Sequence, residues 1–551
     1  MRRSLLKTAV AAVLVCAAVR GRAQHVVSEP DVVKEHHRDF DALQARTVST
    51  RVSRGSRVAD TAGRPTVITA PSDWTPIRIA VFTFDIDDSG RYCTAAGQRR
   101  PDFTGKTVTC EPDDVLTDTK KQTLLEFLIP SAVRLHEERL SVKREEGNIV
   151  VDRDTFEASK CRDFSIPASH MREGVANADF VLYVAAGPTV DDTVAWAGMC
   201  QYFANGRPSV GVANVSPRDI NTDPQEMRAI AHEILHALGF HFHIFEEQRM
   251  VGYVDSLRGK PNVPVIMSPR VAAQARAHFG CEKQTFLELE DKGGEGTELS
   301  HWKRRSMKDD LMAGNTVAGI YSAITIAVME DTGFYKGNYA MAEPMIYGRN
   351  AGCELVQEKC VVNGVSRFPE MFCGSANRDK LVCTSDRLGV GNCKIVNHDS
   401  RLPPQFQYFS SPTLGGEDEE MDYCPYVERY AETRCFFGGR FLNGSVYGAL
   451  SRCFDAPAGF AESGRSSAQY GLCAEVHCGT TTYSVKVKGA RMYTRCTPGT
   501  TLPLSLLSPT FSSGQITCPP YDSVCGIRVT TTQARWRDAA GKGDARSGQS
   551  S

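Results

Sequence analysis

Cysteine is the residue type that most constrains the fold of this chain. Of 19 cysteines in 551 residues, 13 lie between Cys353 and Cys525, amid many glycines, prolines and serines. A cytosolic protein seldom keeps so many thiols unless they bind metal, and the chain has no paired CxxC motifs with zinc-site spacing. The sequence therefore predicts a disulfide framework formed in an oxidising compartment.

The cysteine numbers also predict a link between two regions. Apart from Cys16, five cysteines precede Cys353 and 13 lie from there onward, and both numbers are odd. Complete pairing then needs at least one bridge between the two regions, and Cys281 is our candidate for it. A total of 18 cysteines predicts nine bridges and no free thiol.

The first 23 residues have the features of a secretory signal peptide. Three basic residues precede an apolar run over 8–19, and small and polar residues follow up to Ala23. This run is shorter than the roughly 20 residues that a membrane-spanning helix needs. We therefore predict cleavage near residue 23, which removes Cys16, and entry into the secretory pathway.

Composition excludes several classes of protein. A formal net charge of −1 argues against a nucleic-acid-binding protein, and 41% hydrophobic residues are enough to build folded cores. In the first half, local patterns predict a compact α/β unit with strands over 77–84 and 180–186 and a helix over 120–143. The length predicts about three to four domains.

The segment from Asp223 to Gly239 predicts a helix with clear ends. Asp223 can cap its first turn, a proline suits its first position, and Gly239 can supply a left-handed stop. Inside it, the sequence HEILH places His232 and His236 four residues apart, so both project from one face and can bind one metal ion. Glu233 can then accept a proton from a metal-activated water without being a ligand itself.

The third metal ligand is not decided by the local sequence. HExxHxxG opens a metzincin zinc site, which usually has a third histidine three residues after the glycine, but this position is Phe242. Three alternatives remain: a shift that brings in His241 or His243, ligation by Glu246 or Glu247, or a third ligand far downstream. Ligation by a glutamate would make the protein a gluzincin-type peptidase, in which the glycine stop has no purpose.

Longer motifs resemble one protease family. They are HEILHALGF from His232, RGKPNVPVI from Arg258, FGCEKQTFLELEDKGGEGTELSH ending at His301, DDLMAG around Met312, YSAITIAVMEDTGFY ending at Tyr335, and GRNAGCELVQEKC ending at Cys360. From about Trp74 into the cysteine-rich half, the chain resembles the leishmanolysin family, the major surface metalloproteases of trypanosomatid parasites. In that family a long insertion separates the glycine from the third histidine.

The resemblance implies the remaining residues of the site. His301 becomes the third ligand beside His232 and His236, with one Zn²⁺ per chain, and the two histidines that flank position 242 become bystanders. Met312 becomes the turn methionine that lies beneath the metal. Like Gly239, it is expected to support the site structurally and not to take part in the chemistry.

The fold that follows is α+β. It consists of a metzincin-like catalytic domain, with a twisted mixed sheet and the active-site helix, and a disulfide-rich, loop-rich C-terminal domain. The predicted divisions are a signal peptide 1–23, a propeptide 24–70, an N-terminal catalytic subdomain 71–240, a subdomain 241–345 with the insertion, third ligand and methionine turn, a cysteine-rich domain 346–530, and a disordered tail 531–551.

Two features depart from the family pattern. Relatives offer a propeptide cysteine in a pattern like HRCxHD before an AMQAR-like stretch, whereas here HHRDFDALQAR over 36–46 has Arg38 at that place. Latency through a thiolate is therefore excluded, which leaves latency that is weaker or that uses His36, His37 or Asp39, or a propeptide that only assists folding. The tail lacks the apolar segment that signals a C-terminal lipid anchor, which favours secretion over anchorage.

Together these residues predict a secreted or cell-surface zinc metalloendopeptidase that cuts extracellular or host proteins, with Glu233 as the general base. The alternative is a non-catalytic adhesion or decoy protein that keeps the zinc site and binds host surfaces through its cysteine-rich half. An intact set of three ligands and a base argues against a pure pseudoenzyme. An active protease could also have an accessory role in cell adhesion.

Two triplets match the signal for N-glycosylation. Asn214 begins NVS and Asn443 begins NGS, and both are predicted as surface sites of a secreted chain. A proline directly after the first triplet weakens it as a signal.

Overall fold

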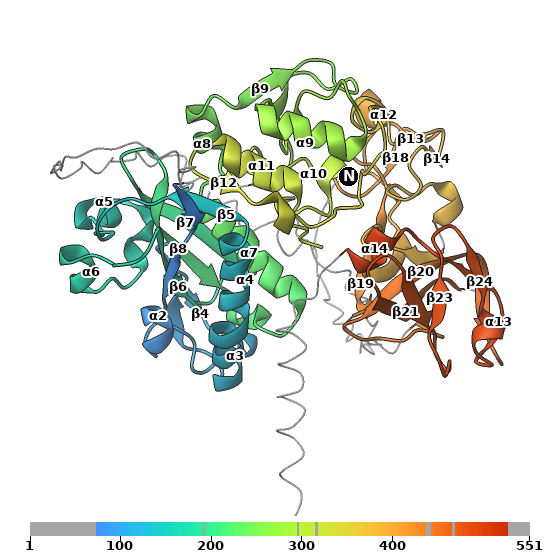
Figure 1. The fold of residues 1–551 in the computed structure, drawn as a ribbon, viewed down its shortest axis with the longest axis horizontal. Helices are drawn as coiled ribbons and strands as arrows, with labels where there is room; N and C mark the ends of the chain where they lie inside the picture. Colours follow the sequence, from blue (N-terminus) through green and yellow to red (C-terminus); the bar gives the residue numbers. More distant parts are fainter. Residues whose placement is uncertain are drawn as a thin grey trace, which may run out of the picture.

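A computed structural model describes residues 73–190, 193–294, 297–314, 318–378, 380–436, 442–464 and 469–526. The predicted signal peptide, propeptide and C-terminal tail lie outside the described residues. Figure 1 shows the described chain in three parts: a sheet with flanking helices, a middle part around α8 to α11, and a β-rich part from β19 onward. No helix in the described ranges is long and apolar enough to cross a membrane.

The first part is built on a mixed four-stranded sheet, as the sequence predicted. Its strands, in spatial order, are β2 (Ile79–Phe82), β6 (Phe180–Ala185), β8 (Pro208–Val215) and β7 (Ala195–Tyr202). The first three are parallel, and β7 runs antiparallel to β8. Every residue of β6 and β8 is buried because both faces of the sheet are covered, which explains their continuous apolar runs.

The two faces of this sheet belong to two different cores. Leu182 and Val184 point into the main core, where α4 (Ile129–Glu137) and α7 (Pro224–Ala237) pack side by side. Tyr183 belongs to a smaller core on the opposite face. Other elements of this part are β1 (Trp74–Pro76), α2 (Phe84–Asp87), β3 (Arg99–Pro101), β4 (Thr107–Thr109), α3 (Asp118–Thr123), a short π-helix (Leu124–Leu128), α5 (Arg153–Ala158) and α6 (Ala168–Arg172).

The helix predicted over 120–143 ends earlier than expected. It stops at Glu137, and Leu140–Lys143 forms strand β5, which pairs antiparallel with β1 and with β12 (Lys336–Gly337). In β5 the side chains of Leu140 and Val142 are buried while their neighbours are not, a period of two that suits a strand. The helical reading of this segment was therefore wrong for its last turn.

The middle part consists of several helices and a small sheet. The sheet has the order β11 (Leu287–Glu288), β10 (Val263–Ile266), β9 (Val251–Val254). The helices are α8 (Phe242–Glu247), α9 (Pro269–Phe279), α10 (Arg304–Met307) and α11 (Ala323–Asp331). Side chains from this part and from α7 share one continuous hydrophobic core. The first part and the middle part are therefore packed together and do not form separate cores.

The cysteine-rich half contains two main antiparallel sheets and many short elements. A five-stranded antiparallel sheet has the order β23 (Thr494–Cys496), β22 (Tyr483–Lys486), β21 (Gln469–Cys478), β20 (Ser451–Glu462), β25 (Phe511–Ser513), and a three-stranded sheet has the order β15 (Leu381–Cys383), β16 (Gly389–Cys393), β19 (Val427–Arg434). Shorter elements are α12 (Glu354–Gln357), β13 (Val361–Val362), β14 (Val365–Ser366), β17 (Val396–Asn397), β18 (Leu414–Gly415), β24 (Thr501–Pro503), α13 (Leu504–Leu507), β26 (Gln515–Thr517) and α14 (Tyr521–Cys525). Long strands such as β20 carry its core, and loops and turns join the many short elements.

Nine disulfides pair all 18 cysteines of the described residues, which confirms the predicted number. Cys281 bonds to Cys353 and so links the two regions, as the odd counts required. The other bridges are Cys93–Cys110, Cys161–Cys200, Cys360–Cys424, Cys373–Cys393, Cys383–Cys453, Cys435–Cys473, Cys478–Cys525 and Cys496–Cys518.

Polar contacts also join the cysteine-rich half to the start of α7. Arg434, at the end of β19, forms an ion pair with Asp223, the residue that caps α7. Arg429 donates from Nη2 to Oε1 of Gln225 at 3.0 Å. The active-site helix therefore begins at a surface that the second half supplies.

Candidate metal centre

Helix α7 carries the first two candidate ligands and forms as the sequence predicted. Its first turn is capped by the carboxylate of Asp223, which accepts from the backbone N–H of Gln225 at 2.9 Å, and Pro224 occupies the first helical position. From Met227 onward every residue is buried, and β7, β8 and α4 pack against the helix. The imidazoles of His232 and His236 thus lie one turn apart in a setting without solvent.

The end of α7 orients the second ligand. Gly239 has a φ of 112°, a left-handed value that favours glycine, and the N–H of Phe240 donates to the carbonyl of Leu235 at 3.0 Å. This turn brings the carbonyl of Phe240 back to His236, whose Nδ1 donates to it at 2.8 Å. The helix stop is therefore part of the metal centre.

The third candidate ligand comes from a hairpin-like loop in the middle part. Its neighbour Trp302 bridges to Leu289, and the N–H of Glu290 donates to the carbonyl of His301 at 2.8 Å. Nδ1 of His301 donates to the carbonyl of Thr297 at 3.0 Å. Both contacts fix the imidazole, which is fully buried.

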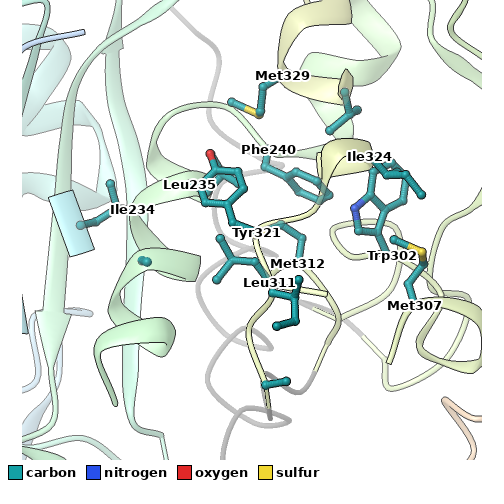
Figure 2. Close-up of a cluster of buried hydrophobic side chains, with 14 of the residues drawn as sticks. Ile234, Leu235, Phe240, Trp302, Met307, Leu311, Met312, Tyr321, Ile324 and Met329 are labelled. Carbon is teal, nitrogen blue, oxygen red and sulfur yellow. The ribbon is translucent and has the colours of Figure 1, made fainter. Parts of the chain in front are cut away.

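The turn around Met312 closes the site from another side. The carbonyl of Leu311 accepts from Nδ1 of His232 at 2.5 Å. Asp310 holds the turn, since its Oδ1 accepts from the N–H of Met312 at 2.8 Å and from the hydroxyl of Thr325 at 2.6 Å. Figure 2 shows Leu311 and Met312 in the apolar cluster that also contains Ile234, Leu235, Phe240, Trp302, Met307, Tyr321, Ile324 and Met329.

The three imidazoles converge on one point. Their Nε2 atoms form a triangle, with 3.0 Å between His232 and His236, 3.1 Å between His232 and His301, and 3.2 Å between His236 and His301. Nitrogens that bind one zinc ion tetrahedrally at about 2.0–2.1 Å lie roughly 3.3 Å apart. The triangle thus has the dimensions that a single tetrahedral ion requires.

The hydrogen bonds also fix the protonation of the three rings. Each Nδ1 lies against a backbone carbonyl and must therefore carry the proton, which leaves the Nε2 lone pair free for a metal. Burial, together with the nearby His232 and His301, lowers the pKa of His236 well below its ordinary value. Neutral imidazoles are the form that binds zinc.

Glu233 lies beside this triangle on the same helix. Its Oε1 is 4.0 Å from Nε2 of His232, and its carboxylate accepts from the backbone N–H of Ala197 in β7. Burial raises the pKa of the Glu233 carboxyl well above its ordinary value, and the Ala197 N–H opposes that shift. A carboxylate held this close to, but outside, a set of three nitrogens is placed to exchange protons with a group bound there.

Comparison with known proteins decides which family this architecture represents. The family model described as leishmanolysin matches residues 15–531. This chain belongs to the leishmanolysin family. The leishmanolysin of Leishmania major is 39% identical over 526 residues, which cover 93% of this chain and 87% of that protein. A leishmanolysin homolog of Crithidia fasciculata is 39% identical and covers 84% of this chain and 72% of its own length.

More distant relatives extend the family beyond these organisms. A leishmanolysin-like peptidase of Drosophila melanogaster is 29% identical over 544 residues, which cover 75% of this chain and 79% of that protein. Leishmanolysins are zinc-dependent metalloendopeptidases, and membership over nearly the whole chain makes this protein a metalloendopeptidase. The leishmanolysin resemblance noted from the sequence motifs is thereby confirmed.

The structure also shows where the alternative third ligands predicted from the sequence lie. His241 is buried but caps α8, where its Nδ1 accepts from the N–H of His243 at 3.2 Å, and burial lowers its pKa to about 4. His243 lies on the surface of α8, with Nε2 3.3 Å from Oε1 of Glu247, and Glu246 is exposed beside them. Among the described residues, only His232, His236 and His301 form a group of three metal-capable side chains.

One predicted modification site is contradicted by the fold. Asn214 lies in β8 and is fully buried, where its Oδ1 accepts from the N–H of Gly187 at 2.8 Å and its Nδ2 donates to the carbonyl of Gly187 at 3.1 Å. A glycan cannot be attached to this amide in the folded chain. Asn443 lies partly exposed in a turn, and glycosylation there stays a prediction.

Sequence reasoning missed the backbone groups that orient the ligands. The carbonyls of Leu311, Phe240 and Thr297 each hold one imidazole, yet a carbonyl leaves no trace in residue type. The left-handed glycine before Phe240 was the one local signal that pointed to such a contact. Asp310 hydrogen-bonds the methionine turn, whereas the carboxylate of Asp309 pairs with Lys308.

Proposed function

We propose that this metalloendopeptidase is secreted or displayed at the cell surface and binds one zinc ion through His232, His236 and His301. The observation that carries this assignment is the triangle of Nε2 atoms with sides of 3.0–3.2 Å, with each Nδ1 held by a carbonyl. Such preset, neutral rings fit a cation and would repel one another without it. The arrangement is compatible with a metzincin-type site in which Met312 supports the centre from below.

We further propose that Glu233 is the general base. When bound, zinc would lower the pKa of a coordinated water and polarise a peptide carbonyl. The Glu233 carboxylate would accept the proton of the attacking water and then give it to the leaving amine. The N–H of Ala197 keeps this carboxylate on the side of the triangle that faces β7.

Substrates are proposed to be extracellular or host proteins, because the cysteine framework and the amino-terminal sequence both indicate the secretory pathway. Adhesion is proposed as a second role on the family resemblance alone. A pure decoy protein would gain nothing from a buried, complete set of ligands and base.

Cleavage of casein or gelatin by the purified mature chain tests the proposal. We expect activity that a zinc chelator abolishes and added zinc restores. Glu233→Ala should lose hydrolysis while still binding one zinc, and Glu247→Ala, which changes a surface glutamate of α8, should keep wild-type activity. Full activity of Glu233→Ala would refute the mechanism, and loss of zinc from Glu247→Ala would favour the gluzincin-type ligand set.

A further inference from the structure

An acidic segment of the cysteine-rich half is buried against the middle part. Asp418, Glu420 and Asp422 are all less than 5% exposed. The disulfide Cys360–Cys424 holds the segment at its end, and Asp418, three residues after β18, pairs with Arg304 of α10. Buried carboxylates are stable only with partners, so the contacts of this segment define what it does.

All three acids lie beside the basic residues that follow His301. Oδ1 of Asp422 lies 3.0 Å from Nζ of Lys303, and Asp418 forms an ion pair with Arg304, whose Nη1 also lies 3.9 Å from Oε2 of Glu420. The backbone N–H of Arg304 also donates to Glu290, whose own N–H donates to the carbonyl of His301. The residues that directly follow His301 are therefore held by carboxylates of the cysteine-rich half.

The third acid, Glu420, lies between two loops that orient ligands. A methyl group added at Gly293 would lie 2.9 Å from its Oε1 and 2.8 Å from Cγ2 of Thr297. One added at Gly314 would lie 3.4 Å from its Oε2 and 3.1 Å from Cγ2 of Thr297. The Glu420 carboxylate thus touches the loop of Thr297 on one side and the end of the methionine turn on the other.

Each of these loops supplies a carbonyl to one candidate ligand. Thr297 accepts from Nδ1 of His301, and Leu311, three residues before Gly314, accepts from Nδ1 of His232. A shift of either loop would move a carbonyl and rotate the ring that depends on it. Partners of this kind tune the metal affinity of histidine sites by roughly 10–100-fold.

We propose that Glu420 is a positioning residue for the metal centre: the cysteine-rich half uses it to set the two loops that orient His301 and His232. The inference rests on the proposed zinc site. It makes the cysteine-rich half a working part of the peptidase and not an appended module. Zinc affinity, and not only the stability of the fold, should depend on this carboxylate.

Zinc affinity of the full mature chain, measured by competition with a chromophoric chelator, tests the proposal. We expect Glu420→Ala to raise the zinc Kd about tenfold or more, and Glu420→Gln, which keeps the length and one oxygen acceptor, to raise it less. Asp85→Asn is the matched control, because Asp85 is a buried carboxylate that pairs with Arg91 far from the ligands in sequence. It should lower the thermal midpoint and leave the zinc Kd unchanged.

The outcomes separate this inference from the assignment of the site. A wild-type chain that binds no zinc, or a His301→Ala variant that binds it as tightly as wild type, would refute the proposed ligands. If His301→Ala weakens binding while both Glu420 variants keep the wild-type Kd, only the positioning role is overturned. Should Glu420→Ala fail to fold, Glu420→Gln decides alone: a zinc Kd equal to that of Asp85→Asn contradicts the proposal.

Discussion

The backbone carbonyl of Leu311 accepts a hydrogen bond from Nδ1 of His232 at 2.5 Å. This contact joins the methionine turn to the active-site helix across 79 residues of sequence. It gives the turn a function that does not require the sulfur of Met312 to touch a metal. The buried methionine fills space so that the carbonyl before it stays in place.

Shortening this methionine should therefore weaken both the fold and the site. Met312→Ala is expected to cost about 2–5 kcal/mol in the free energy of unfolding of the metal-free protein, because a fully buried side chain leaves a cavity. Met312→Leu should cost less than about 1.5 kcal/mol. Urea unfolding measures both, and Met371→Ala, which truncates a buried methionine of the cysteine-rich half, is the control that should spare zinc affinity. Equal zinc affinities for the two alanine variants would argue against the supporting role.

The helix stop should be coupled to metal binding. Gly239→Ala places a side chain at a φ of 112°, which costs roughly 1–2 kcal/mol, and should also displace the Phe240 carbonyl that holds His236. Gly97→Ala imposes similar backbone strain at a φ of 81° in open space. Chelator competition should show weaker zinc binding for the first variant only. Identical zinc affinity in both would mean that the stop has no part in the site.

The raised pKa of Asp310 should make the free energy of unfolding fall as pH rises. Burial raises its pKa to about 6, against about 3.9 in an unfolded chain. The folded protein therefore holds this proton more tightly, so the stabilisation is present at low pH and lost as pH rises through about 6.

The comparison variant is Asp310→Asn, which cannot titrate. Between pH 4 and 7, wild type should lose on the order of 1–3 kcal/mol of unfolding free energy relative to this variant. Urea unfolding of both metal-free proteins over that pH range gives the difference between their free energies of unfolding. The other titrating groups are the same in both proteins, so their contributions cancel in this difference. Parallel curves would contradict the assigned shift.

Control of the precursor should not involve a thiol. Every cysteine of the described residues is in a disulfide, and the predicted propeptide, 24–70, contains no cysteine. We expect thiol titration of the denatured, unreduced mature chain to find no free thiol, and an organomercurial to leave precursor activity unchanged. Activation by the mercurial would show that a thiol outside these pairs exists. A precursor that is inert and gains nothing when residues 24–70 are removed would count against any latency role of that segment.

Local features of the sequence predicted the parts of the fold that depend on local chemistry. The capped helix with its left-handed stop, the buried strand over 180–186 and the bridge from Cys281 were all predicted and are confirmed. His301 could be assigned only by resemblance, because an insertion separates it from the helix and its neighbours SHWKR read as an exposed polar stretch. Its position depends on contacts between distant segments.

Buried charged residues illustrate why the contacts between distant segments could not be predicted from the sequence. Lys303 and Arg304 are less than 2% exposed, which their own sequence does not suggest. Their partners Asp422 and Asp418 lie more than a hundred residues later, so only the folded chain brings the charges together. Asn214 shows the converse, because a glycosylation triplet reports nothing about burial in a strand.

The most direct test of the central claim is a crystal structure of the zinc-loaded mature chain with anomalous scattering at the zinc edge. We predict one peak, with Nε2 of His232, His236 and His301 each at about 2.0–2.1 Å and Glu233 outside bonding distance. A peak bound instead by His232, His236 and a glutamate of α8, or no peak between the three imidazoles, would contradict the account.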